Sequence, residues 1–509
     1  MEIRMKRRTF LGTGAVTAAG LLLPPAVSQA ASEATPWAAL QRSIDGAVVL
    51  PDDPRYDTVR ALALRQFDAI RPQAVVRCES AGDVAEAVRF AVRHRIPTVA
   101  RSGGHSFAGY STTTGMVIDV SPMDHLRMAG EVARMGPGCQ LIDVEEGLAP
   151  RGVAVPTGWC PTVAIGGLAL GGGLGFLTRM HGVASDRMLR AQVVLADGRV
   201  VESDERRHPD LFWALRGGGG GNFGIVTEYD FAPVPAPDMT SFTLTWPWSA
   251  ARAVIGAWQQ WTASTPDALT PLLNLSTYGD DPAVEPGVTV SGVWLSSPDG
   301  LVPLLARLTA MAGTSPTTSQ QRTDSYGMGM RHWFGCDDLD PAGCHRIGHN
   351  PQAKLARYGF ALARGNFYDA PLDEAGIDAA LAAFADARKA GEYRSLDLQG
   401  LGGAHNRVSA TATAYVHRSA LFYGGWSVGI DVPEGEVLES ARRRACQEWV
   451  DRAYGRVHPW SSGQSYQNYI DPDLADWRQA YYGVNYRRLV AVKEAYDPRG
   501  FFRFAQSIG

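Results

Sequence analysis

Residues 101–106 read Arg-Ser-Gly-Gly-His-Ser, and residues 158–167 read Gly-Trp-Cys-Pro-Thr-Val-Ala-Ile-Gly-Gly. Each stretch places a reactive side chain, His105 or Cys160, among glycines. Glycine has no Cβ, so the backbone N–H groups beside it can approach a phosphate closely. The two stretches therefore predict that a phosphate-containing dinucleotide cofactor lies against the chain near His105 and Cys160.

Glycine also concentrates at residues 166–175 and 217–224. Residues 219–224 match the pattern G-x-G-x-x-G, which in a Rossmann fold follows a strand and opens a helix. Here the pattern follows a helix-like stretch, 210–215, and enters a strand-like stretch that begins at residue 225. Because the order is reversed, a Rossmann fold is excluded. Purely structural glycines remain the alternative for any single cluster.

The composition is that of a globular protein with a sizeable core. Of 509 residues, 45% are hydrophobic and 20% are charged, which excludes a disordered or coiled-coil chain. The formal net charge of −4 gives no basic surface for nucleic acid. We therefore expect a small-molecule substrate and no nucleic-acid partner.

Strand-like and helix-like stretches alternate in the first part of the chain: strands at 74–78, 96–100 and 116–120, and a helix at 81–94. This alternation continues to about residue 227 and predicts an α/β or α+β domain. Proline-rich residues 231–237 predict a domain boundary. Beyond it, alternation at 288–294 and a helix at 379–384 predict an antiparallel sheet covered on one side by helices.

The N-terminus has the pattern of an export signal. Arg7 and Arg8 precede an apolar run from Leu11 to Leu23, and Ser28-Gln29-Ala30 supplies a cleavage site. The run is shorter than the roughly 18 residues that span a bilayer. We expect residues 1–30 to be a signal peptide read by the twin-arginine export machinery, giving a secreted protein with no membrane association after cleavage. An uncleaved anchor is the alternative.

The cysteines are too few for a disulfide scaffold, since there are 6 in the whole chain. Cys336 and Cys344 bracket a turn-rich loop, and His345 and His349 follow, so a zinc site is conceivable. The cysteine spacing is longer than zinc sites usually have, and an oxidising compartment favours a disulfide. We therefore predict a Cys336–Cys344 disulfide and no metal.

Three N-terminal stretches, 101–106, 158–167 and 221–227, occur in one order with a set of C-terminal motifs: Tyr466-Gln467-Asn468-Tyr469, Asn485-Tyr486-Arg487-Arg488-Leu489, Asp497-Pro498 and Phe501-Phe502. In these motifs the sequence resembles the berberine bridge enzyme-like family of bicovalent FAD-linked oxidases. The resemblance covers residues 70–230 and 460–509, and the middle of the chain matches only loosely.

The resemblance implies an α+β fold of the vanillyl-alcohol-oxidase type, with a PCMH-type FAD-binding domain of two subdomains. The expected organisation is a signal peptide at 1–30, an FAD-binding domain at 31–237, a substrate domain at 238–460, and a segment at 461–509 that returns to the FAD domain.

The resemblance also implies roles for individual residues. FAD would be bonded through C8α to His105 and through C6 to Cys160, and Tyr469 would be the catalytic base. Asp397 and Gln399 would reach the substrate. The other cofactor contacts implied are Arg101, Ser102, Gly103, Gly104, Ser106, Gly158, Thr162, Val163, Gly166, Gly167, Gly171, Gly172, Gly173, Gly175, Ile225, Val226, Tyr466, Asn468 and Asn485.

Two of these expectations are specific enough to be checked against geometry. If residues 466–469 form a strand, Tyr466 and Asn468 face away from Gln467, and the resemblance implies that both hydrogen-bond the flavin. A tyrosine has an ordinary pKa near 10, so Tyr469 needs its pKa lowered by about three units to act as a base at pH 7.

The implied activity is that of a secreted FAD-dependent oxidase. It would take a hydride from an alcohol carbon of a sugar-like substrate or secondary metabolite to flavin N5, and O2 would become H2O2. Phe107 and Leu168 stand where relatives carry tyrosine and plant relatives carry histidine, which disfavours a plant-type alkaloid or cannabinoid substrate. The alternatives are a dehydrogenase with another electron acceptor, a catalytically silent exported binding protein, and a non-flavin zinc enzyme.

Overall fold

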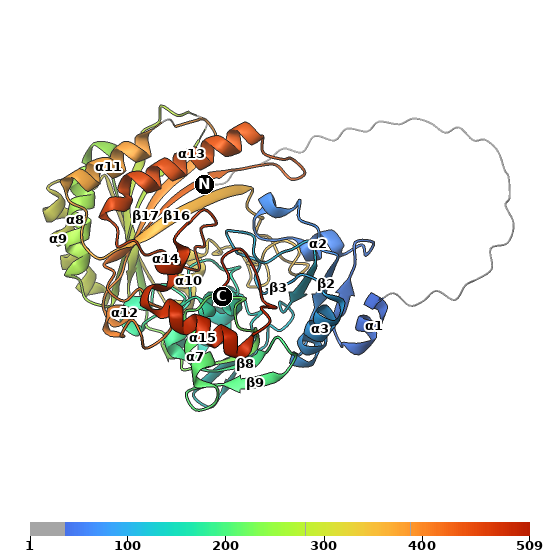
Figure 1. Cartoon of the computed structure of the whole chain (residues 1–509). Helices are drawn as coiled ribbons and strands as arrows, with labels where there is room; N and C mark the ends of the chain where they lie inside the picture. Colours follow the sequence, from blue (N-terminus) through green and yellow to red (C-terminus); the bar gives the residue numbers. More distant parts are fainter. Residues whose placement is uncertain (1–35, 280, 387) are drawn as a thin grey trace, which may run out of the picture.

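The computed structural model describes residues 36–279, 281–386 and 388–509. The predicted signal peptide at 1–30 lies outside these residues. Three sheets organise the chain: a four-stranded and a five-stranded sheet in the N-terminal half, and a seven-stranded sheet beyond residue 238 (Figure 1). Helices and mostly antiparallel strands are combined, so the expected α+β class is confirmed.

The first sheet has the strand order β1-β2-β4-β3, with β1 (Ala47–Val49), β2 (Ala74–Arg77), β3 (Thr98–Arg101) and β4 (Met116–Asp119). β2 and β3 both run parallel to β4, while β1 is antiparallel to β2. Helix α3 (Ala81–His94) packs on the sheet through a buried face that includes Val84 and Val88. Ser80 caps α3 by accepting a hydrogen bond from the backbone N–H of Asp83. The predicted helix at 81–94 is confirmed.

The second sheet is antiparallel and has the order β5-β6-β10-β8-β9, with β5 (Leu126–Ala129), β6 (Val132–Met135), β8 (Met188–Val194), β9 (Val200–Ser203) and β10 (Ile225–Phe231). The connections between these strands carry α4 (Leu141–Leu148), α5 (Ile165–Leu170), α6 (Thr178–His181), α7 (Pro209–Leu215) and the short strand β7 (Val153–Ala154). β7 pairs with β11 (Val234–Pro235), which follows β10. α7 precedes the third glycine cluster, residues 217–224, and β10 follows it. This helix-to-strand order is the reverse of the Rossmann order, as the sequence indicates.

The seven-stranded sheet is wholly antiparallel, in the order β15-β12-β14-β13-β17-β18-β16. Its strands are β12 (Met239–Trp246), β13 (Leu269–Thr277), β14 (Gly287–Trp294), β15 (Thr318–Asp324), β16 (Phe360–Tyr368), β17 (Tyr393–Gly400) and β18 (Phe422–Ile430). One face is covered by α8 (Ala251–Ala263), α9 (Leu301–Ala312), α11 (Glu374–Ala385) and α13 (Ser440–Val457) (Figure 1).

Alternation along the strands decides what each face of this sheet carries. On β17, Leu396 and Leu398 belong to the hydrophobic core, whereas Asp397 and Gln399 line a cavity. Successive side chains of a strand point to opposite faces, so the face away from the helices presents polar groups. The predicted one-sided antiparallel sheet is confirmed.

The C-terminal segment returns to the N-terminal half of the molecule. α15 (Tyr486–Tyr496) lies beside α7, and α14 (Trp477–Tyr482) packs against α15; both are red in Figure 1. The buried Lys493 donates from Nζ to the carbonyl oxygen of Asn222 at 2.6 Å and to Asp497 at 2.7 Å. The backbone N–H of Ile508 donates to Asn222 Oδ1 at 2.9 Å. The end of the chain therefore holds the third glycine cluster in place.

Cys336 and Cys344 form a disulfide in the loop after α10 (Tyr326–Trp333), so this prediction is confirmed over the zinc alternative. His345 instead lies 3.0 Å from a carboxylate oxygen of Asp143, and its ring stacks on that of His349 at 4.5 Å between centroids.

Two further observations bear on the predictions. Residues 466–469 form a turn rather than a strand, because the backbone N–H of Tyr469 donates to the carbonyl oxygen of Tyr466 at 2.9 Å. The alternative that these residues form a strand is therefore excluded. Within the described ranges, the structure contains no helix with the length and apolar character needed to cross a bilayer.

Candidate functional site

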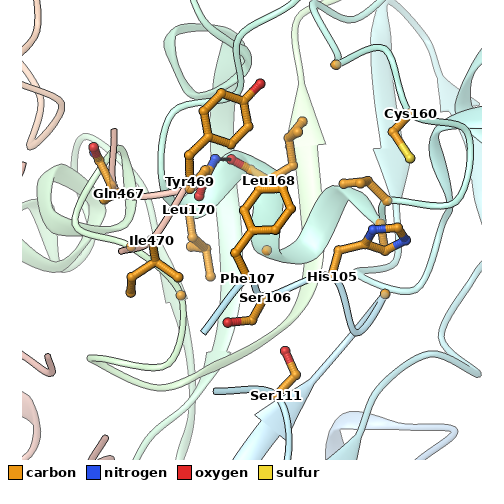
Figure 2. Close-up of a pocket in the computed structure, with 18 of the residues that line it drawn as sticks. His105, Ser106, Phe107, Ser111, Cys160, Leu168, Leu170, Gln467, Tyr469 and Ile470 are labelled. Atoms are coloured by element: carbon orange, nitrogen blue, oxygen red, sulfur yellow. Dashed lines mark hydrogen bonds between the residues drawn. The ribbon is translucent and has the colours of Figure 1, made fainter. Parts of the chain in front are cut away.

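A cavity of about 970 Å3 lies between the glycine-rich loops of the N-terminal half and the polar face of the seven-stranded sheet. It brings together most of the predicted site residues: Arg101, Ser102, Gly103, Gly104, His105, Ser106, Gly158, Cys160, Val163, Gly166, Gly167, Ile225, Val226, Asp397, Gln399, Tyr466, Asn468 and Tyr469. Figure 2 shows His105 and Cys160 together on one side of the cavity, with Phe107 and Tyr469 across from them.

The loop after β3 is built to present His105. Arg101 is buried and pairs with Asp119 at 2.8 Å, and Ser102 Oγ donates to the carbonyl oxygen of Pro137 at 2.6 Å. Gly104 has φ +70°, a left-handed backbone that favours glycine. Arg101 and Ser102 therefore use their side chains to hold the loop, and the turn directs the imidazole of His105 into the cavity.

His105 and Cys160 share one neighbour, Thr162. The Thr162 hydroxyl oxygen lies 2.9 Å from His105 Nε2 and 3.8 Å from Cys160 Sγ. Burial, together with the positive charge of Arg346, lowers the pKa of His105 to about 3. The imidazole is therefore neutral and can act as a nucleophile at physiological pH.

Cys160 also faces a residue of the middle region. Its Sγ lies 4.0 Å from the hydroxyl oxygen of Tyr358. Tyr358 is anchored by backbone hydrogen bonds to Ala63 and Arg65, so a loop of the middle region lies over the sulfur. The two halves of the molecule thus meet directly above Cys160.

Several glycines leave room along the cavity wall. A Cβ added at Gly167 or Gly220 would meet no atom within 4 Å, and both residues line the cavity. Gly221, also at the wall, has φ +75°. Side chains at these positions would fill space that a bound group could use. The site therefore fits the flat and phosphate-bearing parts of FAD.

Six predicted cofactor residues do not line the cavity: Thr162, Gly171, Gly172, Gly173, Gly175 and Asn485. The glycines are needed for packing within the protein. A Cβ at Gly175 would lie 1.5 Å from the carbonyl oxygen of Thr157, and one at Gly173 would lie 2.6 Å from Cβ of Ala184. Asn485 donates from Nδ2 to the carbonyl oxygens of Ala410, at 2.7 Å, and Ala414, at 3.3 Å. These residues support the cavity wall from positions outside the cavity.

Tyr466 and Asn468 line the cavity, but protein groups occupy their polar atoms. The hydroxyl oxygen of Tyr466 accepts hydrogen bonds from the backbone N–H groups of Gly173, at 2.8 Å, and Leu174, at 3.2 Å, and from Asn468 Nδ2 at 2.9 Å. Asn468 Nδ2 also donates to the carbonyl oxygen of Leu168 at 2.8 Å. Hydrogen bonds from Tyr466 and Asn468 to the flavin would have to use polar atoms that do not take part in these protein contacts.

Tyr469 lies in the same turn, and its ring faces the cavity beside Phe107 and Tyr423, at 5.9 and 5.3 Å between centroids. Burial raises the pKa of Tyr469 to about 12, while hydrogen bonds from Gln399 and Trp159 oppose that rise. The lowered pKa expected of a base is therefore not supplied by the surrounding protein groups. The two donors do favour the phenolate, but the desolvation of a buried ring outweighs them.

The sheet supplies a polar wall opposite the glycine loops. Asp397 accepts from Asn274 Nδ2 at 2.6 Å and from Ser395 Oγ at 2.6 Å, and burial raises the pKa of its carboxyl group. Gln399 Oε1 is buried and has no hydrogen-bond partner within the described part of the chain. An unpaired buried acceptor is costly, so this atom is available to a substrate hydroxyl.

Sequence reasoning misses part of this cavity: Gly219, Gly220, Gly221, Asn222, Gly224, Asn274, Ser291, Tyr358 and Ser427. The third glycine cluster is visible in the sequence, where its context excluded a Rossmann fold and residues 221–227 contributed to the resemblance, but its glycines were not assigned to the cofactor. The polar residues of β13, β14 and β18 carry no local signal, because any exposed strand face can look the same.

Two family models match the chain: one described as "FAD binding domain" at residues 72–204, and one as "Berberine and berberine like" at residues 465–509. The FAD-linked oxidoreductase YgaK of Bacillus subtilis is 30% identical over 475 residues, covering 91% of this chain and 97% of that protein. The chitooligosaccharide oxidase of Gibberella zeae is 29% identical over 461 residues, covering 86% of this chain and 87% of that protein.

The solved structure of the Physcomitrella patens BBE-like 1 protein has a TM-score of 0.82, with 26% identity over 93% of this chain and 99% of that one. The FAD-binding fold and the matched sequences agree. The chain belongs to the berberine bridge enzyme-like family and is an FAD-dependent oxidoreductase.

Proposed function

We propose that the protein is an oxidase that takes a hydride from an alcohol carbon of a carbohydrate-like substrate, with O2 as the electron acceptor and H2O2 as the product. One observation carries this proposal: a single cavity holds His105 and Cys160 on one side and, across from them, Tyr469 beside a polar sheet face. The first pair would hold FAD, and the opposite side would hold the substrate.

His105 and Cys160 are placed to attach FAD covalently. His105 is neutral because its pKa is low, Cys160 lies on the same wall, and open glycine positions continue that wall. When bound, FAD supplies the hydride acceptor. The protein would hold FAD so that its hydride-accepting face stays accessible from the side of the seven-stranded sheet.

Tyr469 would accept the hydroxyl proton of the substrate. Its ring faces the cavity, and the hydrogen bonds from Gln399 and Trp159 stabilise the phenolate that forms after its own proton has left. Because burial raises the pKa of Tyr469 to about 12, the base form grows with pH throughout the physiological range. We expect the rate of flavin reduction to increase with pH without levelling near neutrality.

The sheet face favours a polyhydroxylated substrate. Asn274, Ser291, Asp397, Gln399 and Ser427 all line the cavity, and the aromatic rings of Trp333 and Tyr393 border the same space. Polar groups in register on a rigid sheet can bind several hydroxyls, and aromatic rings can pack on sugar faces. The named activity of the chitooligosaccharide oxidase supports the same substrate class.

Acid precipitation tests covalent attachment. The unaltered protein should stay yellow after denaturation, His105→Ala and Cys160→Ala should each still retain flavin, and the double variant should release it. Release of free FAD by the unaltered protein would reject covalent attachment.

Tyr469→Phe tests the chemistry. The variant should bind flavin and fold, yet anaerobic flavin reduction by an oligosaccharide substrate should be slower by about 10²–10⁴-fold, the usual contribution of a general base. Phe107→Tyr, which restores a hydroxyl nearby without removing Tyr469, serves as a control for local polarity. Equal reduction rates in Tyr469→Phe and the unaltered enzyme would remove Tyr469 from the mechanism.

We further propose that the mature protein is extracytoplasmic and reaches its location by twin-arginine export. The Cys336–Cys344 disulfide supports this, because disulfides persist in oxidising compartments. Replacing Arg7 and Arg8 by lysines should leave the protein in the cytoplasm, as cell fractionation would show. Unchanged export of that variant would contradict the proposed route.

A further inference from the structure

Thr162 is the only residue that we find in hydrogen-bonding contact with both His105 and Cys160 in the described structure. Its side chain is 6% exposed and does not line the cavity, so it stands behind the two attachment residues. The distances are 2.9 Å from Oγ1 to His105 Nε2 and 3.8 Å from Oγ1 to Cys160 Sγ.

A hydroxyl can accept one hydrogen bond and donate another at the same time. If His105 Nε2–H donates to Thr162 Oγ1, the proton of neutral His105 is on Nε2 and the lone pair of Nδ1 is free. The Thr162 hydroxyl hydrogen can then point to Cys160 Sγ, where it stabilises a thiolate. One hydroxyl would thus prepare two nucleophiles.

We propose that Thr162 is a positioning residue for covalent attachment of FAD: its hydroxyl sets the tautomer of His105 so that Nδ1 attacks the flavin, and it supports the sulfur of Cys160 as the second nucleophile. This inference rests on the proposed bicovalent attachment. It assigns a role to a residue that touches neither the substrate nor the cavity.

Both attachments are two-electron reductions of the flavin. At His105, a C8α–H bond breaks, the Nδ1–C8α bond forms, one proton leaves to solvent, and the electron pair of the broken bond enters the flavin ring. At Cys160, the thiol proton and the C6 proton leave, the S–C6 bond forms, and two electrons again enter the ring. O2 takes up each pair of electrons and becomes H2O2, which restores the oxidised flavin.

The groups that face these nucleophiles come from several segments. Arg346 lies behind His105 and favours the neutral ring, since it depresses the pKa of His105. The hydroxyl oxygen of Tyr358 lies 4.0 Å from Cys160 Sγ. Electrostatic repulsion from Cys160 contributes to the raised pKa of Tyr469. Neither Tyr358 nor Tyr469 has a hydrogen bond to His105 among the contacts of the described chain, whereas Thr162 contacts the ring with its hydroxyl and with its backbone, so the tautomer of His105 depends on Thr162.

The test uses full-length protein produced under flavin limitation and then supplied with FAD. Thr162→Val removes the hydroxyl with little change in shape, and Thr162→Ser keeps it. Loss of one supporting hydrogen bond should slow attachment by about tenfold at each site. The two sites are followed separately in the Cys160→Ala and His105→Ala backgrounds, by flavin that remains on the acid-precipitated polypeptide. Thr162→Ser should restore the rate.

Thr112→Val is the matched control. Thr112 is also a buried threonine of the same half, and its hydroxyl has no hydrogen-bond partner in the structure as described. This variant should attach flavin at the unaltered rate.

A second measurement distinguishes a change in the tautomer of His105 from a general loosening of the loop by Thr162→Val. In the Cys160→Ala background, flavin peptides from the unaltered His105 site should carry the bond at Nδ1. The Thr162→Val variant should give a mixture of Nδ1 and Nε2 products, which NMR of the isolated peptide distinguishes. In the His105→Ala background, Thr162→Val should also move the pH profile of attachment to higher pH.

Three results would overturn the inference while leaving bicovalent attachment intact. These are attachment by Thr162→Val at the unaltered rate, a Thr162→Ser variant as slow as Thr162→Val, or attachment of the unaltered protein through Nε2 of His105. If the unaltered protein instead releases all of its flavin on denaturation, the proposed attachment fails and this inference fails with it.

Discussion

Tyr466 offers a sharp test of how the cavity is held together. Its hydroxyl oxygen accepts hydrogen bonds from two backbone N–H groups, those of Gly173 and Leu174, and from the side chain of Asn468. Tyr466→Phe removes the acceptor and leaves the ring in place. The variant should therefore destabilise the loop that contains Gly173, while the protein keeps its flavin.

The expected loss follows from the number of donors left unpaired. Both backbone N–H groups are buried, and an unpaired buried donor costs about 1–2 kcal/mol, so Tyr466→Phe should lower the free energy of unfolding by about 2–4 kcal/mol. Asn468 keeps its bond to Leu168 and adds little. Tyr229→Phe is the control: Tyr229 is also buried and lines the cavity, but it makes one bond, to the carbonyl oxygen of Gly166, so we expect about 1 kcal/mol.

Denaturant unfolding of the flavin-loaded proteins measures both variants, and acid precipitation measures the flavin that each retains. Tyr466→Phe should be clearly less stable than Tyr229→Phe, with flavin retention unchanged in both. The reasoning is refuted if Tyr466→Phe is as stable as the control. It is also refuted if that variant loses flavin while its stability is unaltered, since the hydroxyl would then act on the cofactor rather than on the loop.

Gly158 lines the cavity two residues before Cys160, and no left-handed φ requires glycine there. A valine would add bulk to the wall that is proposed to hold the flavin, where O2 must reach the reduced cofactor, so Gly158→Val should slow reoxidation of the reduced enzyme by O2 on the order of tenfold. Anaerobic reduction should change little, and Gly167→Ala, at a cavity glycine where an added Cβ would meet no atom within 4 Å, should behave normally in stopped-flow mixing with oxygenated buffer. Sluggish reoxidation of the unaltered enzyme with fast transfer to a quinone dye would indicate a dehydrogenase. Burial raises the pKa of Glu145 to about 8, from an ordinary 4.5, and Thr157 donates to its Oε1. Because the folded protein binds this proton more tightly than the unfolded chain, stability should fall as pH rises from about 4.5 to 8. Glu145→Gln should flatten that slope in denaturant melts; an unchanged slope would place the titrating group elsewhere.

Local patterns predicted several elements closely. The helix at Ala81–His94 was predicted from an apolar face at helical spacing. The structure adds the Ser80 N-cap and the left-handed Arg95 at which the helix ends. The one-sided sheet beyond residue 238 follows from alternation along its strands. In contrast, the aromatic residues of 466–469 left a strand open as an alternative, and only the hydrogen bond from Tyr469 back to Tyr466 shows that they form a turn.

The glycine clusters show where composition stops being informative. The sequence indicates that glycine is needed at Gly167 and at Gly175, but it does not say what each one faces. Gly167 opens onto the cavity, whereas Gly175 lies against the carbonyl oxygen of Thr157. Both uses demand a missing Cβ, so only the packing of distant segments distinguishes a cofactor wall from a protein contact.

The sequence by itself indicated a dinucleotide cofactor from its glycine motifs and, through its resemblance to the family, FAD with the attachment candidates His105 and Cys160, because short motifs of glycine and a reactive side chain are local in the chain. Only the tertiary structure decided that Thr162 bridges the two and that Tyr358 closes over the sulfur. The same is true of the raised pKa of Tyr469, which burial causes. Contacts between segments far apart in the chain, and the exclusion of water that follows from them, depend on how the two halves pack, and no local pattern records that packing.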